Sequence, residues 1–280
     1  MKTAQYIGEL DRAYKSLSED IQNLSNYSWS GSSTEQFVEF VKRSALIRQY
    51  EAIAAVRSAF ENGTSHLLAS LLRPAYEEML WLEYIRKHKE VSLDLILSMA
   101  QNEVYNGIEA QRGYLTKSEL NEIGFTSSIL KAASEALKRT EDSLLAIGKK
   151  LSWRQGALKP TITSIAKSVG RHEEYLFLYH GTSRAVHFSP HELGRRVWGS
   201  YGDVKISSNN FSSYWNDFTI IWQWRIFSES ALASEYDFRK SSFAWGNKEI
   251  FISLLELLPR VQIVTRGELE RWPEPRFERR

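Results

Sequence analysis

The sequence predicts an all-α fold, an antiparallel bundle of about seven to nine helices with no significant sheet. Apolar residues recur at three- and four-residue steps along most of the 280-residue chain, which is the spacing of one helix face. Turn sequences separate these periodic segments, and only residues 203–207, DVKIS, could pair as a strand. Because one short strand alone is unstable, we expect helices to pack on helices throughout.

Five helices are expected before the first clear linker, over residues 3–26, 34–62, 65–89, 90–115 and 127–151. The sequence SGSS at 30–33 is a turn, and Asn62-Gly63 ends the second helix. Pro74 lies inside the third helix and predicts a kink or a break there, because proline has no amide hydrogen. The linker is SWRQGALKP at 152–160.

Four further helices are expected after the linker, over residues 161–169, 171–188, 211–238 and 246–265. The longest irregular segment is WGSYGDVKISSNN at 198–210, and the tail at 269–280 is expected to fray or to dock through Trp272. We expect residues 1–280 to form a single helical domain, with 1–151 and 160–268 as an alternative subdivision.

The composition is that of an ordinary globular protein. Hydrophobic residues make up 42% of the chain and charged residues 25%, so extended disorder is not expected. The formal net charge of +2 argues against a globally basic nucleic-acid binder. The chain has no cysteine, which fits a cytoplasmic location. With neither a secretory signal nor a run of roughly 20 apolar residues, no membrane partner is expected.

Two helical segments carry unusual polar residues, and the first is LLRPAYEEMLWLEYI. Arg73 and Glu77 are four residues apart in it and share one helix face. Apolar residues flank both side chains. The pair is therefore either a satisfied structural ion pair, which is the more common case, or a site poised for charge.

The second segment is YHGTSRAVHFSPHE at 179–192, which holds three of the chain's six histidines. His180, Arg184 and His187 follow one another at steps of four and three residues on one helix face. Ser183 lies beside them on the same surface. These four side chains are the functional candidates of the segment.

Glycine and proline shape this second segment. Gly181 costs about 1 kcal/mol inside a helix relative to alanine, so we expect it to permit close approach of another helix or a ligand. The helix should end by Ser189, because Pro190 disfavours helical geometry in the residue before it. A capping box then starts the next helix, with Ser189 as N-cap and Glu192 reaching back. His191, near that helix N-terminus, would tend to be neutral.

Three histidines suggest a metal site, but their spacing argues against one. His180 and His187 are about 10 Å apart along a helix axis, and His187 reaches His191 only across the break at Pro190. No third ligand stands at a metal-binding spacing, so we expect no metal and no cofactor. Signatures of P-loop, dinucleotide-binding, serine-hydrolase and zinc-protease sites are also missing from the sequence.

The remaining residue types favour acid–base chemistry on a phosphate. Histidine titrates near neutral pH and arginine has a fork geometry suited to phosphate, and a ribonuclease without metal needs both groups. A nucleophilic pair of Ser183 and His187 is an alternative, although Ser183 lacks the elbow that activates a serine hydrolase. In a third alternative, the hydroxyl and the imidazole only satisfy buried partners.

The two segments together resemble an uncharacterised, mainly bacterial helical family, domain of unknown function 5677. The family pattern is Arg-x-x-x-Glu and then, roughly a hundred residues later, Tyr-x-x-x-Ser-x-x-x-His. The matching residues here are Arg73 and Glu77, followed by Tyr179, Ser183 and His187. The similarity covers about residues 35–195. It implies that the two segments face each other in the bundle, and it implies no activity.

A looser resemblance is to the helical HEPN ribonuclease and toxin domains. Their signature is an arginine, four to six residues, and then a histidine, and Arg184 and His191 match this spacing across Pro190. The resemblance implies an RNA-cleaving toxin, and families of this type often act in defence against phage.

Two functions are therefore expected as alternatives. The first is a helical interaction or effector subunit of a bacterial system, such as anti-phage defence, with a protein partner or a second copy bound through Trp215, Trp222 and Trp224. The alternative is a metal-independent ribonuclease-like toxin acting on RNA. The candidate catalytic residues are His187, His180, Ser183 and Glu77, and the candidate ligand-binding residues are Arg73, Arg184 and Tyr179.

Overall fold

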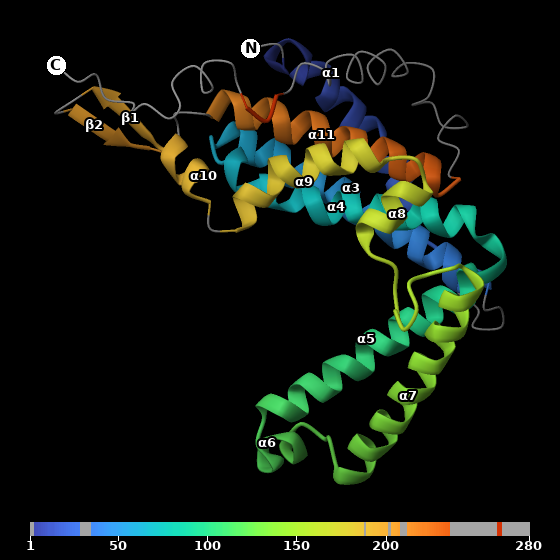
Figure 1. The fold of residues 1–280 in the computed structure, drawn as a ribbon. Coiled ribbons are helices and arrows are strands. Elements are labelled where there is room, and N and C mark those ends of the chain that lie inside the picture. Colours follow the sequence, from blue (N-terminus) through green and yellow to red (C-terminus); the bar gives the residue numbers. More distant parts are fainter. Residues whose placement is uncertain are drawn as a thin grey trace.

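The computed structural model describes residues 3–28, 35–187, 189–200, 203–207, 212–235 and 262–264. Helices dominate these residues and confirm the all-α fold class (Figure 1). The helices are α1 (Thr3–Ser16), α2 (Ser18–Ser25), α3 (Glu35–Glu61), α4 (Ser65–Lys87), the short 3-10 helix η1 (Lys89–Val91), α5 (Ser92–Tyr114), α6 (Lys117–Glu122), α7 (Ser127–Lys150), α8 (Ile162–Ser168), α9 (His172–Val186), α10 (Pro190–Arg195) and α11 (Ser212–Ala233).

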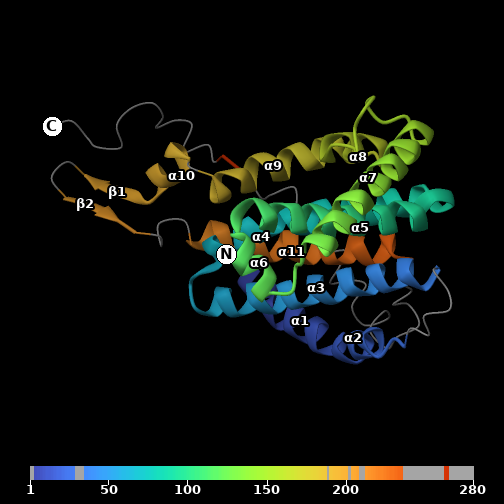
Figure 2. The same cartoon turned by 90° about the horizontal axis from the view of Figure 1, so that it is seen from below.

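Four long helices, α3, α4, α9 and α11, form the bundle. Helix α11 packs against both α3 and α4, and α4 also packs against α9, while α1 and α2 cover α3 from outside (Figure 2). The apolar residues of α11 are spread around the helix rather than gathered on one face, and a helix of that kind is mostly buried. Trp224, Phe218 and Phe227 on this helix are accordingly no more than 1% exposed.

A helical hairpin, which we call the arm (residues 92–150), projects from one end of the bundle (Figure 1). Helices α5 and α7 pack along each other, and α6 lies at their far end. At the root of the arm, Trp153 donates a hydrogen bond from Nε1 to the hydroxyl of Tyr84 on α4, at 2.8 Å. A Cβ atom at Gly148 would lie 2.7 Å from the Trp153 ring. Only glycine leaves room for this anchor.

A small hairpin extends beyond α10 (Figure 1). Strands β1 (Val197–Ser200) and β2 (Asp203–Ile206) pair antiparallel, with Val197 opposite Ile206 and Ser200 opposite Asp203. The sequence left 203–207 without a partner strand, because 197–200 contains glycine and serine and shows no alternation. A partner so near in the chain removes the instability of a lone strand.

Several boundaries differ from those that the sequence predicts. The helix expected at 3–26 is divided at Leu17 into α1 and α2. Helix α4 passes through Pro74 without a break, since the ring sits on the exposed outer side of a well-packed helix. Gly63 ends α3 with a φ of +68°, as the sequence predicts. The helix expected at 246–265 lies outside the described residues apart from 262–264, as does the tail with Trp272.

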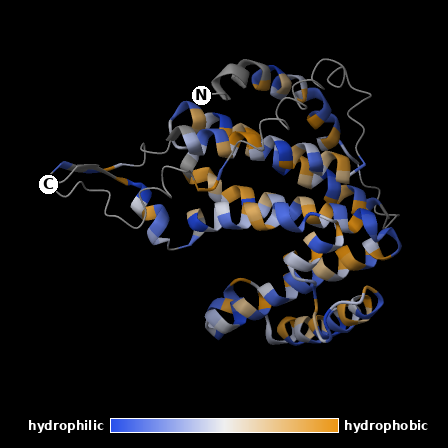
Figure 3. Cartoon of the chain, turned by 45° about the horizontal axis from the view of Figure 1, so that its top comes forward, coloured by the Kyte–Doolittle hydropathy of each residue, from blue (hydrophilic) through white to orange (hydrophobic). Residues whose placement is uncertain are grey.

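The helices are amphipathic or buried rather than uniformly apolar on their outer surfaces. Figure 3 shows hydrophilic and hydrophobic residues interleaved along them. Within the described part of the chain, no helix combines the length and the apolar character needed to cross a membrane.

Candidate functional site

Helices α4 and α9 bring together three motif residues that are about a hundred positions apart in the chain. Arg73 Nε on α4 lies 2.8 Å from Glu77 Oε1, one turn further along the same helix. The Arg73 guanidinium also stacks 4.6 Å above the ring of Tyr179 on α9. The two segments therefore face each other, as the family resemblance implies.

The charges of this α4–α9 seam are matched within the protein. Burial lowers the pKa of Arg73, but the hydrogen bond and the negative charge of Glu77 outweigh it, and the net pKa is raised. Both side chains are about a quarter exposed. The ion pair with Glu77 fixes the Arg73 guanidinium, and its cation–π contact in turn positions the ring of Tyr179. Arg73 as a phosphate ligand stays a prediction, because it would have to share its guanidinium with Glu77.

The second half of α9 packs closely against the rest of the bundle. A Cβ atom at Gly181 would lie 2.7 Å from Ile263 Cγ2 and 2.9 Å from Phe218 Cζ on α11. The prediction that Gly181 permits close approach of another helix is confirmed. The helix ends at Val186, and His187 is its C-cap in an extended conformation. This end agrees with the limit set by Pro190.

The last turn of α9 and the start of α10 enclose a pocket of about 210 Å³, which we call the α9–α10 pocket. His187 lies on its wall with an exposed side chain, and half-buried Arg184 lies beside it. Ser183, one turn before His187, is half-buried and is not among the lining residues. The lining side chains used below are Arg184, His187, Arg196, Glu192, Leu67 and Leu193.

The electrostatics of the α9–α10 pocket are cationic. Arg184 and Arg196 contribute two positive charges, while the carboxylate of Glu192 is paired with Arg195 at 3.3 Å. The Leu67 and Leu193 side chains are 58% and 48% exposed and give the pocket an apolar wall. A small cationic pocket with one apolar side suits a phosphate that carries an organic group.

Two further contacts fix the arginines around the pocket. Arg184 Nη1 lies 3.3 Å from His191 Nδ1, and because arginine can only donate, this imidazole nitrogen accepts. The backbone oxygen of Ile263 accepts hydrogen bonds from Arg195 Nη2 at 2.9 Å and from Arg184 Nη1 at 3.5 Å. The backbone at Ile263 thus helps to hold both arginines in place.

The start of α10 confirms Ser189 as the predicted N-cap, while the carboxylate of Glu192 pairs with Arg195. Ser189 Oγ accepts a hydrogen bond from the backbone N–H of Glu192 at 3.3 Å, and Pro190 occupies the first turn. Pro190 therefore divides the histidine-rich stretch into a helix end and a new helix start.

His180 stands apart from the other histidines. It is exposed on α9, with its ring 5.7 Å from that of Tyr179, and it does not line the α9–α10 pocket. Across the residues that the structure describes, no group of three His, Asp or Glu side chains is placed to hold a metal ion.

The prediction that three tryptophans form an exposed partner surface is wrong. Trp215, Trp222 and Trp224 are 2%, 4% and 1% exposed. Trp222 lies edge-on to Tyr76 of α4, with ring centres 6.4 Å apart. Because α11 lies against both α3 and α4, aromatic side chains that suggest an adhesive surface in the sequence instead fill the interior.

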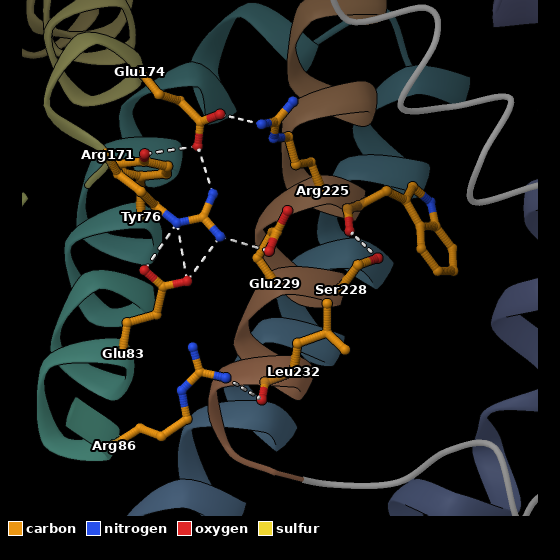
Figure 4. A network of polar contacts seen from close by, with 10 residues as sticks. Tyr76, Glu83, Arg86, Arg171, Glu174, Arg225, Ser228, Glu229 and Leu232 are labelled. Carbon is orange, nitrogen blue, oxygen red and sulfur yellow. Dashed lines mark hydrogen bonds and ion pairs between the residues drawn. The ribbon is translucent and has the colours of Figure 1, made fainter. Parts of the chain in front are cut away.

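A buried charge network at the other end of α9 was not found from the sequence (Figure 4). Arg171 donates to Glu83 of α4 at 2.7 and 2.9 Å, to Glu229 of α11 at 2.6 Å and to Glu174 of α9 at 3.3 Å. Arg225 of α11 also pairs with Glu174. The network joins three helices, and the Glu83 residue is only 7% exposed.

The tyrosine in this network is held in its neutral form. Tyr76 donates its hydroxyl proton to Glu174 at 2.7 Å. Burial raises the pKa of Tyr76 strongly, and the charge and hydrogen bond of Glu174 raise it further. Burial lowers the pKa of Arg171, but its hydrogen bond to Glu83 and the charges of Glu229, Glu83 and Glu174 outweigh it, and the net pKa is raised.

One signal could have indicated the network. Glu83 interrupts the apolar run WLEYI, and Arg225 and Glu229 interrupt the most apolar stretch of the chain. Charges in such runs need partners. The partners lie 58 or 88 positions from Arg171, so no local spacing connects them.

The fold and the site define an all-α bundle protein whose arginine–glutamate helix packs on a tyrosine–serine–histidine helix. The chain belongs to a family of unknown function, DUF5677, whose model matches residues 39–203. That range includes all five motif residues, from Arg73 to His187. No curated protein and no solved structure is significantly similar to the chain.

Proposed function

We propose that the protein binds the backbone of single-stranded RNA in the α9–α10 pocket and cleaves it without a metal ion. His187 is the acid–base group and Arg184 is a phosphate ligand. The observation that supports this proposal is the exposed imidazole of His187 in one pocket with two guanidinium groups, those of Arg184 and Arg196. An imidazole beside arginines is the minimum that acid–base chemistry on a phosphate needs.

The shape of the pocket favours a single strand. A volume of about 210 Å³ admits a phosphate with part of one nucleotide and excludes a duplex. Leu67 and Leu193 offer an apolar surface to an unstacked base. The chain as a whole carries only +2, so we expect binding through few phosphates and a shallow dependence on salt.

The proposed reaction is a transesterification in which the ribose 2′-oxygen attacks phosphorus and the 5′-oxygen leaves. His187 takes the proton from the ribose 2′-hydroxyl, and the 2′-oxygen forms a bond to phosphorus. The bond from phosphorus to the 5′-oxygen breaks, and this oxygen takes a proton from the imidazolium. The products are a 2′,3′-cyclic phosphate and a 5′-hydroxyl. Arg184 stabilises the negative charge on the phosphoryl oxygens.

The α4–α9 seam supports this site without contacting the phosphate. Arg73, Glu77 and Tyr179 hold α9 against α4, which fixes the direction in which the last turn of α9 presents His187. We assign these three as positioning residues. Ser183 lies one turn before His187, and its backbone carbonyl oxygen accepts a hydrogen bond from the backbone N–H of His187 at 3.0 Å.

The test is cleavage of an end-labelled, single-stranded RNA by the full chain in buffer containing EDTA. We expect fragments ending in a 2′,3′-cyclic phosphate, and His187→Ala should slow cleavage about 10²- to 10⁴-fold with an unchanged melting temperature. His180→Ala is the matched control, because it removes an exposed imidazole of the same helix outside the pocket. Equal cleavage by His187→Ala and wild type would overturn the assignment.

An interaction or effector subunit of a bacterial defence system is a second candidate. One observation supports it: the arm projects from the bundle and offers a surface that no other described part of the chain covers. Its test is survival of phage-challenged cells that express the chain with substitutions on the arm. If such variants protect cells as well as wild type does, the interaction function is contradicted.

A further inference from the structure

Helix α5 carries an uncovered, uncharged stripe beside its contact with α7. The stripe repeats at alternating steps of four and three residues, which is the spacing of one helix packed in a bundle. None of its side chains is buried, and Val104 is 61% exposed. The stripe consists of Leu97, Gln101, Val104, Ile108 and Gln111 on α5, and the C-cap residue Leu115 continues the spacing in the sequence.

Helix α7 carries a second stripe with the same kind of spacing. Its side chains are small or apolar except for Arg139, and Ile129 is 46% exposed. The α7 residues that face α5, among them Ala133, Thr140 and Leu144, are buried and lie next to this stripe around the helix. The α7 stripe consists of Ile129, Ala132, Ala136, Arg139, Ser143 and Ala146.

Both stripes lie on the same side of the arm. On each helix, the stripe residues come one position before the residues of the seam between α5 and α7, as Ile108 does before Glu109 and Ala132 before Ala133. One position is a rotation of about a quarter turn, and it has the same sense about the chain direction in both helices. The two helices run antiparallel, with Glu109 of α5 level with Ser134 of α7. Equal rotations on antiparallel helices point to the same side. The two stripes thus form one continuous face, which we call the arm face, and Arg139 is the one charged residue in them.

The charges of the arm identify the occupant of this face. Helix α5 has three acidic residues and one basic residue, a net charge of −2, whereas α7 has five basic and three acidic residues, a net charge of +2. A second hairpin of the same sequence, related by a two-fold axis parallel to the helices, places α5 of each copy against α7 of the other, and these opposite net charges favour that arrangement over one that pairs like helices. We propose that the arm face binds the arm of a second copy, forming an antiparallel four-helix bundle.

The hairpin also has too little interior of its own. Two helices bury a single seam, and helices draw most of their stability from packing. In a four-helix bundle, each helix of the arm gains a second neighbour through a stripe with the right spacing. Nucleic acid does not suit this face, since the arm face has no row of cations.

The first test is the solution mass of the full chain by light scattering. We expect twice the 32.4 kDa of one chain, and Val104→Lys should convert the dimer to a monomer, because the new cation faces the basic helix α7 of the second copy. Tyr114→Lys is the matched control: Tyr114 is 89% exposed on α5 but points away from the arm face. It should remain dimeric. A monomeric wild type, or a dimeric Val104→Lys, would overturn the proposal.

The second test separates a loss of contact from a loss of fold. The natural chain has no cysteine, so Val104→Cys and Ala136→Cys can be made as single variants and joined by a short bis-maleimide. We expect cross-linked dimers chiefly when the two variants are mixed, since α5 of one copy lies against α7 of the other. Replacing Val104→Cys by Tyr114→Cys in the mixture should abolish them. Cross-linking that ignores these positions would contradict the proposed face.

Discussion

The two ends of helix α9 use the same kinds of side chain in opposite ways. At the N-terminal end, Arg171 and Glu174 are half-buried, and both are paired within a network that reaches α4 and α11. At the C-terminal end, Arg184 and His187 line a pocket that is open to solvent. One end has its charges satisfied by three helices, and the other presents them outward.

This difference separates stability from function along one helix. Buried charges that are fully paired hold helices in register, but removing one partner leaves the others uncompensated. Charges at a pocket contribute little to folding, because water screens them, and they stay available to a ligand. The two ends should therefore respond in opposite ways to substitution of an arginine.

The largest effect on stability is expected at the N-terminal end of α9, in the charge network. Arg171→Ala should lower the free energy of unfolding by about 3–5 kcal/mol, because it leaves the carboxylates of Glu83 and Glu229 buried without their shared cation. Urea denaturation followed by circular dichroism measures it. Lys89→Ala is the control: its ion pair with Glu235 is 2.6 Å long, but the two side chains are 65% and 46% exposed, so we expect a loss of about 0–1 kcal/mol. Equal losses would contradict the assigned role of the network.

Tyr76→Phe should cost about 1.5–3 kcal/mol, because Glu174 loses a buried donor. The pKa of Tyr76 is raised in the folded chain, so the folded state holds the phenol proton more tightly than the unfolded state does. This contribution is complete below about pH 10 and is lost as the pH rises further. Urea midpoints between pH 8 and 11 should therefore fall less steeply in Tyr76→Phe than in wild type. Parallel profiles would contradict this prediction.

Gly181→Ala tests the packing under the open end. The new Cβ would meet Phe218 and Ile263 at less than 3 Å, and we expect a loss of about 1–2 kcal/mol despite the better helix propensity of alanine. Gly107→Ala is the matched control, because nothing lies within 4 Å of its Cβ position. There the same substitution should stabilise the chain by up to about 1 kcal/mol. Thermal unfolding of both variants would show the opposite signs.

The smallest effect on stability is expected at the open end. Arg184→Gln should change the free energy of unfolding by no more than about 0.5 kcal/mol, while the dissociation constant for single-stranded RNA rises about tenfold and the salt dependence becomes shallower by about one unit of log–log slope. Fluorescence anisotropy at several salt concentrations measures both. Unchanged RNA affinity would separate Arg184 from ligand binding.

Local patterns in the sequence predicted most of the fold. Helix periodicity predicted the bundle, Gly63 predicted the end of α3, and Pro190 predicted the break after α9, since each acts through its own backbone or its nearest neighbours. Residue spacing also predicted the ion pair of Arg73 with Glu77. That the segments of Arg73 and Tyr179 face each other was predicted from the family resemblance, because no local sequence pattern relates positions that far apart.

The features that sequence reasoning missed depend on contacts between distant segments. Trp222 is apolar whether it covers a partner or fills a core, and only the position of α11 against α3 and α4 decides between them. Glu83 pairs with Arg171, which lies 88 positions later in the chain. The pairing of 197–200 with 203–206 was missed for another reason, since glycine and serine give no strand signal.

The backbone oxygen of Ile263 has a consequence for the timing of synthesis. It accepts hydrogen bonds from Arg195 and Arg184, yet it lies 68 positions after Arg195 and 79 positions after Arg184 in the chain. A ribosome therefore completes every pocket-lining residue long before it completes the support for the arginines. A nascent chain cannot hold Arg184 and Arg195 in their final arrangement until the segment around Ile263 has been synthesised.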